Sequence, residues 1–275
     1  MGSNTQRNDL LDAIRGVAIL VVIFGHALQG ACHGQSGATW LHRFIMSFQM
    51  EVFFAISGFA MAYSRSSTLC VALKRRIIRL GIPYLAWVLL FYLAEVILHV
   101  KPLSLGEMLS ACLTSGFWFL RELLMLCIAL ELFRHGIWPH KTALNVILTA
   151  TLLIALSFVP GQENLIHYAI FFFTGYALHI ATGKAPVPKK QAIDTSRFFT
   201  RKLCWCGINS LGLYAIHWNV FFVFLSLHMV DFSVLSSSTA GIYAVTAGLF
   251  AIYLAGSVFA INVISHLPVL RKILY

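Results

Sequence analysis

The chain alternates between long apolar runs and short polar breaks. Eight runs are long enough to cross a bilayer, which needs about 20 apolar residues per helix. They cover residues 12–30, 42–63, 80–99, 116–133, 142–159, 164–182, 205–228 and 239–265. The longest polar break, residues 183–203, is only a linker and leaves no room for a separate soluble domain. The pattern predicts an all-α, polytopic transmembrane helix bundle of about eight spans, with residues 1–275 as a single membrane-embedded domain.

The composition of the chain agrees with a membrane protein and excludes two other classes. Hydrophobic residues make up 59% of the chain and charged residues only 11%, whereas about 25% of residues are charged in soluble domains. So few charges could not cover a soluble domain of this size, and so apolar a chain would not stay disordered. The first apolar run is interpreted as a retained helix, because no A-x-A cleavage site follows His26. The six cysteines have no zinc-ligand spacing, so no metal site is expected.

The basic residues predict the orientation of the spans. The chain has 20 Lys and Arg against 10 Asp and Glu, a net charge of +10. If the N-terminus is cytoplasmic, only Arg43 and Lys101 fall in outside segments, while Arg15 and Arg121 fall inside spans. All other Lys and Arg residues then lie in cytoplasmic segments, as the positive-inside rule requires. We therefore expect both termini inside, and the charge excess gives no support to nucleic-acid binding.

Arg15 and His26 are polar residues of the first span. A charge at the centre of a bilayer costs about 2.5–3.5 kcal/mol on insertion scales, so each such residue is a candidate site residue. Eleven residues make about three helical turns, which places both side chains on nearly the same face, about 16 Å apart along the axis. An alternative is that Arg15 is an anchor paired with Asp12 and that His26 is an ordinary hydrogen-bonded histidine.

Polar residues also interrupt the second and seventh spans. Glu51 lies in an aromatic run and could orient a histidine or balance an arginine, or could form a structural pair. Ser57 could be a nucleophile, although Ser-Gly at this point is more typical of close helix packing. Ser210, Tyr214 and His217 recur at positions i, i+4 and i+7, which predicts one polar stripe facing inward.

Two groups of charges complete the set of candidates. The cluster from Lys74 to Arg79 suits the phosphates of a ligand or lipid headgroups, although such clusters also mark the cytoplasmic side of any membrane protein. Arg121 and Glu122 are adjacent opposite charges within the fourth span, which neighbouring helices could compensate.

Five motifs follow one another in order along the chain. They are Arg15 to His26 with ten intervening residues, Glu51-Val-Phe-Phe-Ala-Ile-Ser57-Gly58-Phe59, Arg76-x-x-Arg79 followed by Pro83, Trp118-Phe-Leu120, and Ser210-Leu-x-x-Tyr214-x-x-His217. In this order they resemble acyltransferase family 3, the integral membrane O-acyltransferases that modify bacterial surface carbohydrates. The chain departs from the family in length, because a member usually has more spans than the eight predicted here.

The resemblance implies a multi-pass enzyme of the bacterial cytoplasmic (inner) membrane. Its donor is cytoplasmic acyl-CoA, most often acetyl-CoA, used as a co-substrate with no tightly bound cofactor. Its acceptor is a hydroxyl of a carbohydrate or glycolipid at the outer side. The resemblance implies that His26 is the general base, that Glu51 orients its imidazole or balances Arg15, and that Tyr214 or Ser210 stabilises the oxyanion. The donor-binding residues are then Arg15, Arg75, Arg76, Arg79 and Trp118.

Several alternatives stay open from the sequence. The acyl group could pass through a covalent intermediate on His26 or Ser57 instead of moving directly. The chain could be a small proton- or anion-coupled secondary transporter, although it lacks the internal repeats that many transporters have. It could also be an acyltransferase-like scaffold that has lost activity. The sequence does not set the acyl group, the acceptor or the oligomeric state.

Overall fold

The computed structural model describes residues 8–32, 39–64, 68–114, 116–135, 142–182, 197–218, 220–223, 238–268, 270 and 273. Within these ranges the chain is helical without strands, which confirms the predicted all-α class. In the same ranges, five helical segments are long and apolar enough to cross a membrane: Asp9–Ala31, Trp40–Met61, Leu69–Ile97, Leu165–Thr182 and Thr239–Ser265. Eight spans and cytoplasmic termini stay predictions.

Helices follow the predicted spans closely where the apolar run is continuous. The first predicted span is α1 (Asp9–Ala31), the sixth is α9 (Leu165–Thr182) and the eighth is α12 (Thr239–Ser265). The fourth and fifth are α7 (Trp118–His135) and α8 (Thr142–Ser157). These helices are too polar or too short to qualify as spans by length and hydropathy alone.

Two predicted spans are each divided into two helices. The second consists of α2 (Trp40–Met46) and α3 (Gln49–Met61). The seventh begins with α10 (Phe198–Ile208) and continues after Asn209 as α11 (Ser210–Ile216), while its predicted end, residues 224–228, lies outside the described residues. At that break the Asn209 amide donates to the Trp205 carbonyl at 2.8 Å. The backbone N–H of Asn209 donates to the same carbonyl at 3.0 Å.

The predicted third span is longer than expected and begins earlier. Helix α4 (Leu69–Arg76) continues through a π-helical segment, η1 (Ile77–Gly81), into α5 (Ile82–Ile97). The basic cluster therefore lies on a helix and not on a polar linker. Pro83, at the start of α5, lacks the N–H that an α-helix would use, and a wider turn accommodates it. The short helix α6 (Leu105–Thr114) was not predicted.

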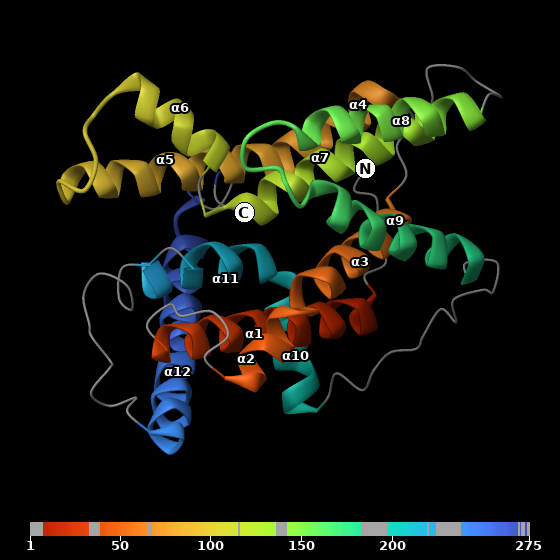
Figure 1. Ribbon diagram of the computed structural model, residues 1–275. Coiled ribbons are helices and arrows are strands. Elements are labelled where there is room, and N and C mark those ends of the chain that lie inside the picture. The colour runs from red at the N-terminus through yellow and green to blue at the C-terminus, as the bar shows by residue number, and fades with distance from the viewer. Residues whose placement is uncertain are drawn as a thin grey trace. The chain divides into compact units, whose positions relative to one another are not determined.

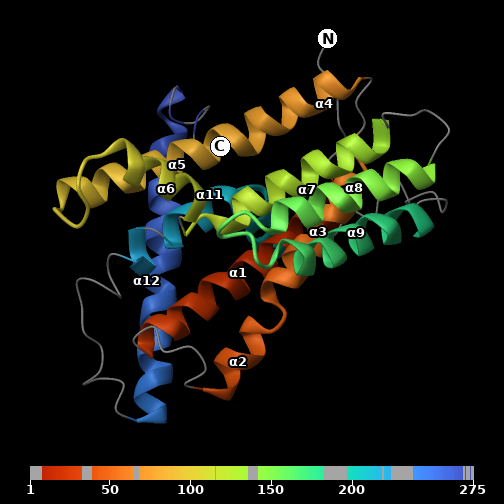
Figure 2. The ribbon, with the colours of Figure 1, turned by 45° about the horizontal axis from the view of Figure 1, so that its top comes forward.

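The chain divides into two compact units. Unit 1 comprises Met1–Ile56 and Leu178–Val263. In it α10 crosses α1 so closely that a Cβ on Gly16 would meet the Leu203 carbonyl, and one on Gly207 would meet the Asp12 carbonyl. Small residues at a crossing allow two backbones this approach. Helix α12 crosses α1 in both ribbon views (Figures 1 and 2). The rings of Phe24 on α1 and Phe250 on α12 meet edge to face.

Unit 2 comprises Ser57–Ala177 and Ile264–Tyr275. Gly58 of α3 lies against the backbone of Phe172 on α9, which is a second close contact between helices. In the same unit the Tyr92 hydroxyl donates to the Pro102 carbonyl at 2.8 Å and accepts from the Ser104 N–H at 2.9 Å, which joins α5 to the segment before α6.

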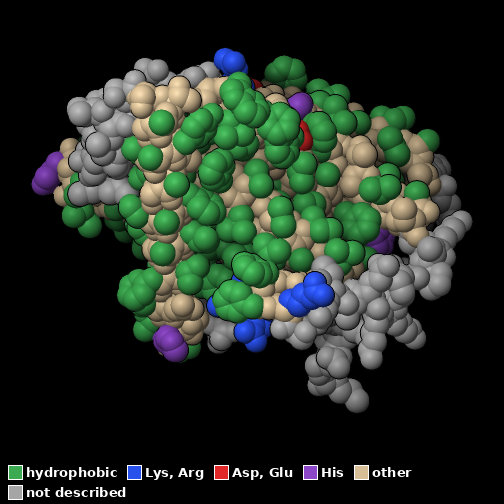
Figure 3. Space-filling model, turned by 90° about the horizontal axis from the view of Figure 1, so that it is seen from below, with side chains coloured by type: hydrophobic (Ala, Val, Ile, Leu, Met, Phe, Trp, Pro, Cys, Tyr) green, Lys and Arg blue, Asp and Glu red, His purple; other side chains and the backbone are tan. Residues whose placement is uncertain are grey.

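Hydrophobic side chains remain on the surface of both units. Val17 is 49% exposed, Ile154 52% and Phe259 71%. Figure 3 shows a face on which hydrophobic side chains predominate and charged ones are few. A soluble protein seldom exposes so much apolar surface, whereas lipid tails solvate it well. The chain is therefore a multi-pass membrane protein.

Candidate functional site

His26 lies on the buried face of α1 and has one defined hydrogen bond. Its Nδ1 is 3.2 Å from the side-chain oxygen of Gln29, one helical turn further on. Because an amide oxygen only accepts, Nδ1 carries the proton and Nε2 keeps its lone pair. The local helix thus holds the imidazole in the form that can act as a base.

Two aromatic residues form a wall beside this ring. The Trp218 ring meets the His26 ring edge to face at 4.3 Å between centroids, and the Phe222 ring lies at 5.3 Å. The two aromatic rings stack on each other at 4.7 Å. Sequence reasoning missed both, although Trp218 directly follows the last motif. The wall shields His26 from water and strengthens electrostatic interactions at the ring.

His217 is the second histidine of this cluster. Its ring centroid lies 5.4 Å from that of His26, and the ring planes are inclined by 33°. The side chain is fully buried, and its Nδ1 is 2.6 Å from the Leu213 carbonyl. The inward-facing stripe predicted for this segment is confirmed for Tyr214 and His217, which are both buried, whereas Ser210 is half-buried.

Other predicted residues of unit 1 lie on α1 and α3. Arg15 is half-buried, and since α1 is uninterrupted, the expected three turns separate it from His26. Glu51 is also half-buried, but the hydrogen bond that orients the His26 ring comes from Gln29. Gln49, two residues before Glu51, lies against α1 beside His26, because a Cβ on Gly25 would come within 2.8 Å of its side-chain oxygen.

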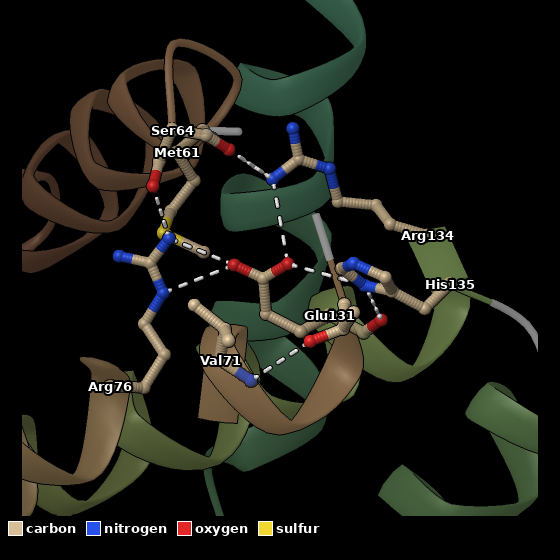
Figure 4. Close-up of polar contacts among 8 residues, drawn as sticks. Met61, Ser64, Val71, Arg76, Glu131, Arg134 and His135 are labelled. Carbon is tan, nitrogen blue, oxygen red and sulfur yellow. Dashed lines mark hydrogen bonds and ion pairs between the residues drawn. The ribbon is translucent and has the colours of Figure 1, made fainter. Parts of the chain in front are cut away.

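Unit 2 contains a buried ion pair between Arg76 of α4 and Glu131 of α7 (Figure 4). The Arg76 Nε and Nη2 donate to the same Glu131 oxygen at 3.1 and 2.8 Å, and Nη2 also donates to the Ser64 hydroxyl at 2.6 Å. Arg76 is 6% exposed and Glu131 1%. A buried charge pair of this kind requires such additional hydrogen bonds, because both charges have lost their water.

Arg134 and His135 complete the Arg76–Glu131 cluster. Arg134 Nη1 donates to the carbonyls of Met61 and Ser64 at 3.2 and 2.8 Å and lies 3.7 Å from the second Glu131 oxygen. It thereby caps the end of α3, where a positive charge is favourable. His135 Nδ1 is 3.0 Å from the Glu131 carbonyl. The cluster joins the end of α3, the end of α4 and the end of α7.

The two arginines of the R-x-x-R motif differ in their surroundings. Arg76 is buried in the ion pair, whereas Arg79, within η1, is exposed. Arg75 is half-buried. The motif therefore presents one guanidinium to the protein interior and one to the surface, which the sequence spacing alone did not reveal.

Arg121 and Trp118 lie near the start of α7. The Arg121 guanidinium donates to the carbonyls of Leu113 and Gly161, which confirms that neighbouring segments compensate its charge. Trp118 is half-buried and stacks on Tyr168 of α9 at 5.3 Å between centroids. Glu163 lies in the loop before α9. Hydrogen bonds from the backbone of Glu163 itself and from the Gly161 N–H lower the pKa of its carboxyl.

Within the described part of the chain, His, Cys, Asp and Glu side chains do not gather in groups of three that could hold a metal ion. The two clusters consist of a buried histidine pair with an aromatic wall in unit 1 and of guanidinium groups around Glu131 in unit 2.

The sequence of the chain matches the family model described as an acyltransferase domain, Acyl_transf_3, over residues 8–184. The chain belongs to this family. The recognition of acyltransferase family 3 is thus confirmed. The matched range contains four of the five motifs, and the Ser210–His217 motif follows it.

A relative of this acyltransferase-family chain is the nodulation protein NolL of Sinorhizobium fredii. The two sequences are 30% identical over 181 residues, which is 62% of this chain and 48% of NolL. The chain thus spans about half the length of the curated relative that it matches. No solved structure matches the chain.

Proposed function

We propose that the chain is a membrane O-acyltransferase. It moves an acyl group, acetyl in the first instance, from cytoplasmic acyl-CoA to a hydroxyl of a carbohydrate or glycolipid acceptor on the outer side of the inner membrane. The observation that carries the proposal is the His26 imidazole, whose Nδ1 is bound to Gln29 and whose Nε2 lone pair is available behind an aromatic wall. Membership of an acyltransferase family supports it.

The reaction needs one group that accepts a proton and one group that donates a hydrogen bond to the oxyanion. His26 Nε2 takes the proton of the acceptor hydroxyl while its oxygen attacks the thioester carbonyl. As the C–S bond breaks, the thiolate of CoA takes the proton back from His26, so the products are an ester and free CoA thiol. Tyr214, buried with its ring 6.1 Å from that of His217, or Ser210 donates to the oxyanion. Glu51 contributes a negative charge that balances Arg15.

The donor site in this proposal rests mainly on Arg79. An exposed guanidinium binds phosphate oxygens in a bidentate manner, and Arg79 is exposed at the end of the basic cluster. Arg75, in the same unit as Arg79, supplies further positive charge. Arg76 acts as a positioning residue, because its guanidinium already binds Glu131 and Ser64.

Trp118 fits the acceptor side better than the donor side on which the sequence placed it. Under the proposed orientation, α7 begins at the outer side and ends at the inner side. Trp118, Tyr168 and Gly161 then share the outer side, whereas Ser64, Arg76 and Arg134 share the inner side. The contacts within unit 2 support this arrangement, since they join Arg121 to Gly161 and Arg134 to Ser64. The stacked pair of Trp118 and Tyr168 offers an aromatic surface to a sugar ring.

The test measures CoA thiol release and labelled acyl transfer by the full chain in detergent, with candidate glycosides as acceptors. We expect His26→Ala to abolish both, while His266→Ala, at an exposed histidine after α12, retains them. Full transfer by His26→Ala would refute the assignment of the base. Substrate counterflow without thiol release would indicate a transporter, and neither signal would indicate a scaffold. Label that stays on the protein without acceptor would indicate a covalent intermediate.

A further inference from the structure

The His26–His217 pair leaves a hydrogen-bonding requirement unmet. His217 is fully buried, and its Nε2 has no hydrogen-bond partner among the described residues. Buried polar atoms in proteins are almost always satisfied by protein, water or ligand. An unsatisfied nitrogen next to the proposed base is therefore a reason to look for a ligand group that completes it.

The hydrogen bonds at the other nitrogens fix what this ligand group must be. His217 Nδ1 lies 2.6 Å from the Leu213 carbonyl, which only accepts, so the proton of the ring is on Nδ1. His26 Nδ1 likewise donates to Gln29. Both Nδ1 protons are thus donated to oxygens of the protein, and both Nε2 atoms carry lone pairs. The two rings cannot hydrogen-bond to each other in this state, and each requires a donor.

A pair of hydroxyls is the ligand chemistry that supplies two donors at this spacing. The two rings are neighbours, with centroids 5.4 Å apart. Hydroxyls on adjacent carbons can donate one ordinary hydrogen bond to each Nε2 when both nitrogens face the same ligand. A metal ion would need further ligands, which the described residues do not provide here. Trp218 and Phe222 supply the apolar surface that a sugar ring can contact between its hydroxyls.

We propose that His217 accepts a hydrogen bond from a second hydroxyl of the acceptor, on the carbon next to the one that is acylated, so that the His26–His217 pair selects acceptors with adjacent hydroxyls. The inference rests on the proposed function. His26 deprotonates the reacting hydroxyl, and His217 holds the neighbouring hydroxyl and so orients the sugar. His217 is thereby a substrate-binding residue of the reaction and not a second base.

The first measurement uses the unmodified chain in detergent with acetyl-CoA. Methyl glycosides of glucose, mannose, galactose and fucose are compared, and the acylated position of the best acceptor is found by NMR. That glycoside is then compared with the deoxy analogue lacking the adjacent hydroxyl and with one lacking a remote hydroxyl. We expect kcat/KM to fall about 10-fold or more for the first analogue and to change little for the second. Equal values for the two analogues would overturn the inference.

Variants assign the effect to His217. His217→Phe keeps a ring but removes the lone pair, so we expect it to use the parent glycoside no better than the adjacent-deoxy analogue. His217→Gln keeps a polar acceptor near Nε2 and should restore part of the discrimination. If His217→Phe keeps the discrimination of the unmodified chain, His217 does not bind the second hydroxyl. If CoA thiol is released but the adjacent-deoxy and remote-deoxy analogues are acylated equally well, this inference alone is contradicted. If no glycoside causes thiol release, the proposed function is contradicted, and the inference with it.

Discussion

Arg76 and Glu131, 55 residues apart in sequence, form a buried ion pair in which one carboxylate oxygen accepts from both Nε and Nη2 of the guanidinium. The pair fixes α4 against α7 within unit 2, and Arg134 extends it to the end of α3. It also removes one arginine of the R-x-x-R motif from the surface. Under the proposed function, Arg76 therefore contributes to stability and Arg79 to donor binding, although the motif alone does not distinguish them.

Glu131→Gln should destabilise the protein. The substitution leaves Arg76 charged and buried without its counter-charge, and breaking a buried pair in this way costs about 3–5 kcal/mol. Thermal unfolding of the purified chain in detergent measures the effect. The double variant Arg76→Met/Glu131→Met, which removes both charges, should unfold at a higher temperature than Glu131→Gln. An unchanged unfolding temperature in Glu131→Gln would show that the pair does not hold these helices together.

Arg79→Gln should weaken acyl-CoA binding and leave the stability of the protein unchanged. Because Arg79 is exposed, its loss leaves the unfolding temperature unchanged. Loss of a guanidinium–phosphate contact should weaken acyl-CoA binding about 10-fold. Isothermal titration with a non-hydrolysable acyl-CoA analogue gives the affinity. Arg43→Gln, at an exposed arginine of α2 on the predicted outer side, is the matched control and should bind the analogue normally. Equal affinity in both variants would remove Arg79 from the donor site.

Gly207→Ala should disrupt the packing of α10 on α1. The added Cβ would overlap the Asp12 carbonyl, which is rigid backbone. Overpacking of this kind costs about 1–3 kcal/mol, and more where the backbone must move. Gly248→Ala in α12 is the control, because a Cβ there meets nothing within 4 Å. It should be neutral or stabilising, since alanine favours the helix. The unfolding temperatures of the two variants are compared, and that of Gly207→Ala should be the lower; equal temperatures would contradict the prediction.

The loop at Gly161 should lose protection in acid. Backbone hydrogen bonds, its own and that from Gly161, lower the pKa of Glu163 from its ordinary value of 4.5. A carboxyl whose pKa is lower in the folded chain stabilises it above pH 4.5 and loses this effect as the pH falls through the lowered pKa. Hydrogen exchange at the Gly161 amide, corrected for intrinsic rates, should show this loss. In Glu163→Gln the protection should not depend on pH.

The apolar pattern predicted the helices better than their interruptions. Long runs such as that of α12 are recognisable because lipid requires uniform apolarity. At the break at Asn209, the side chain donates to the Trp205 carbonyl, a local contact that hydropathy does not report. Breaks of this kind are visible only once the local hydrogen bonds are known.

The candidate site was predictable in part. His26 and His217 were recognisable because polar residues are expensive in a span, whereas Trp218 and Phe222 look like ordinary core residues. Glu131 escaped notice because it resembles a simple i, i+3 partner of Arg134, while its stronger partner is distant in sequence.

The π-helical segment η1 gives α4 and α5 a place where chain length can change. A π-turn is in effect one residue inserted into an α-helix. Deleting one residue from Ile77–Gly81 would restore the α-helix and leave the flanking helices facing as they do now. Deleting one from Ile82–Ile97 would instead rotate everything that follows by about 100°. Insertions and deletions between relatives should therefore concentrate at η1, where the chain length can change without turning Arg76 of α4 relative to α5.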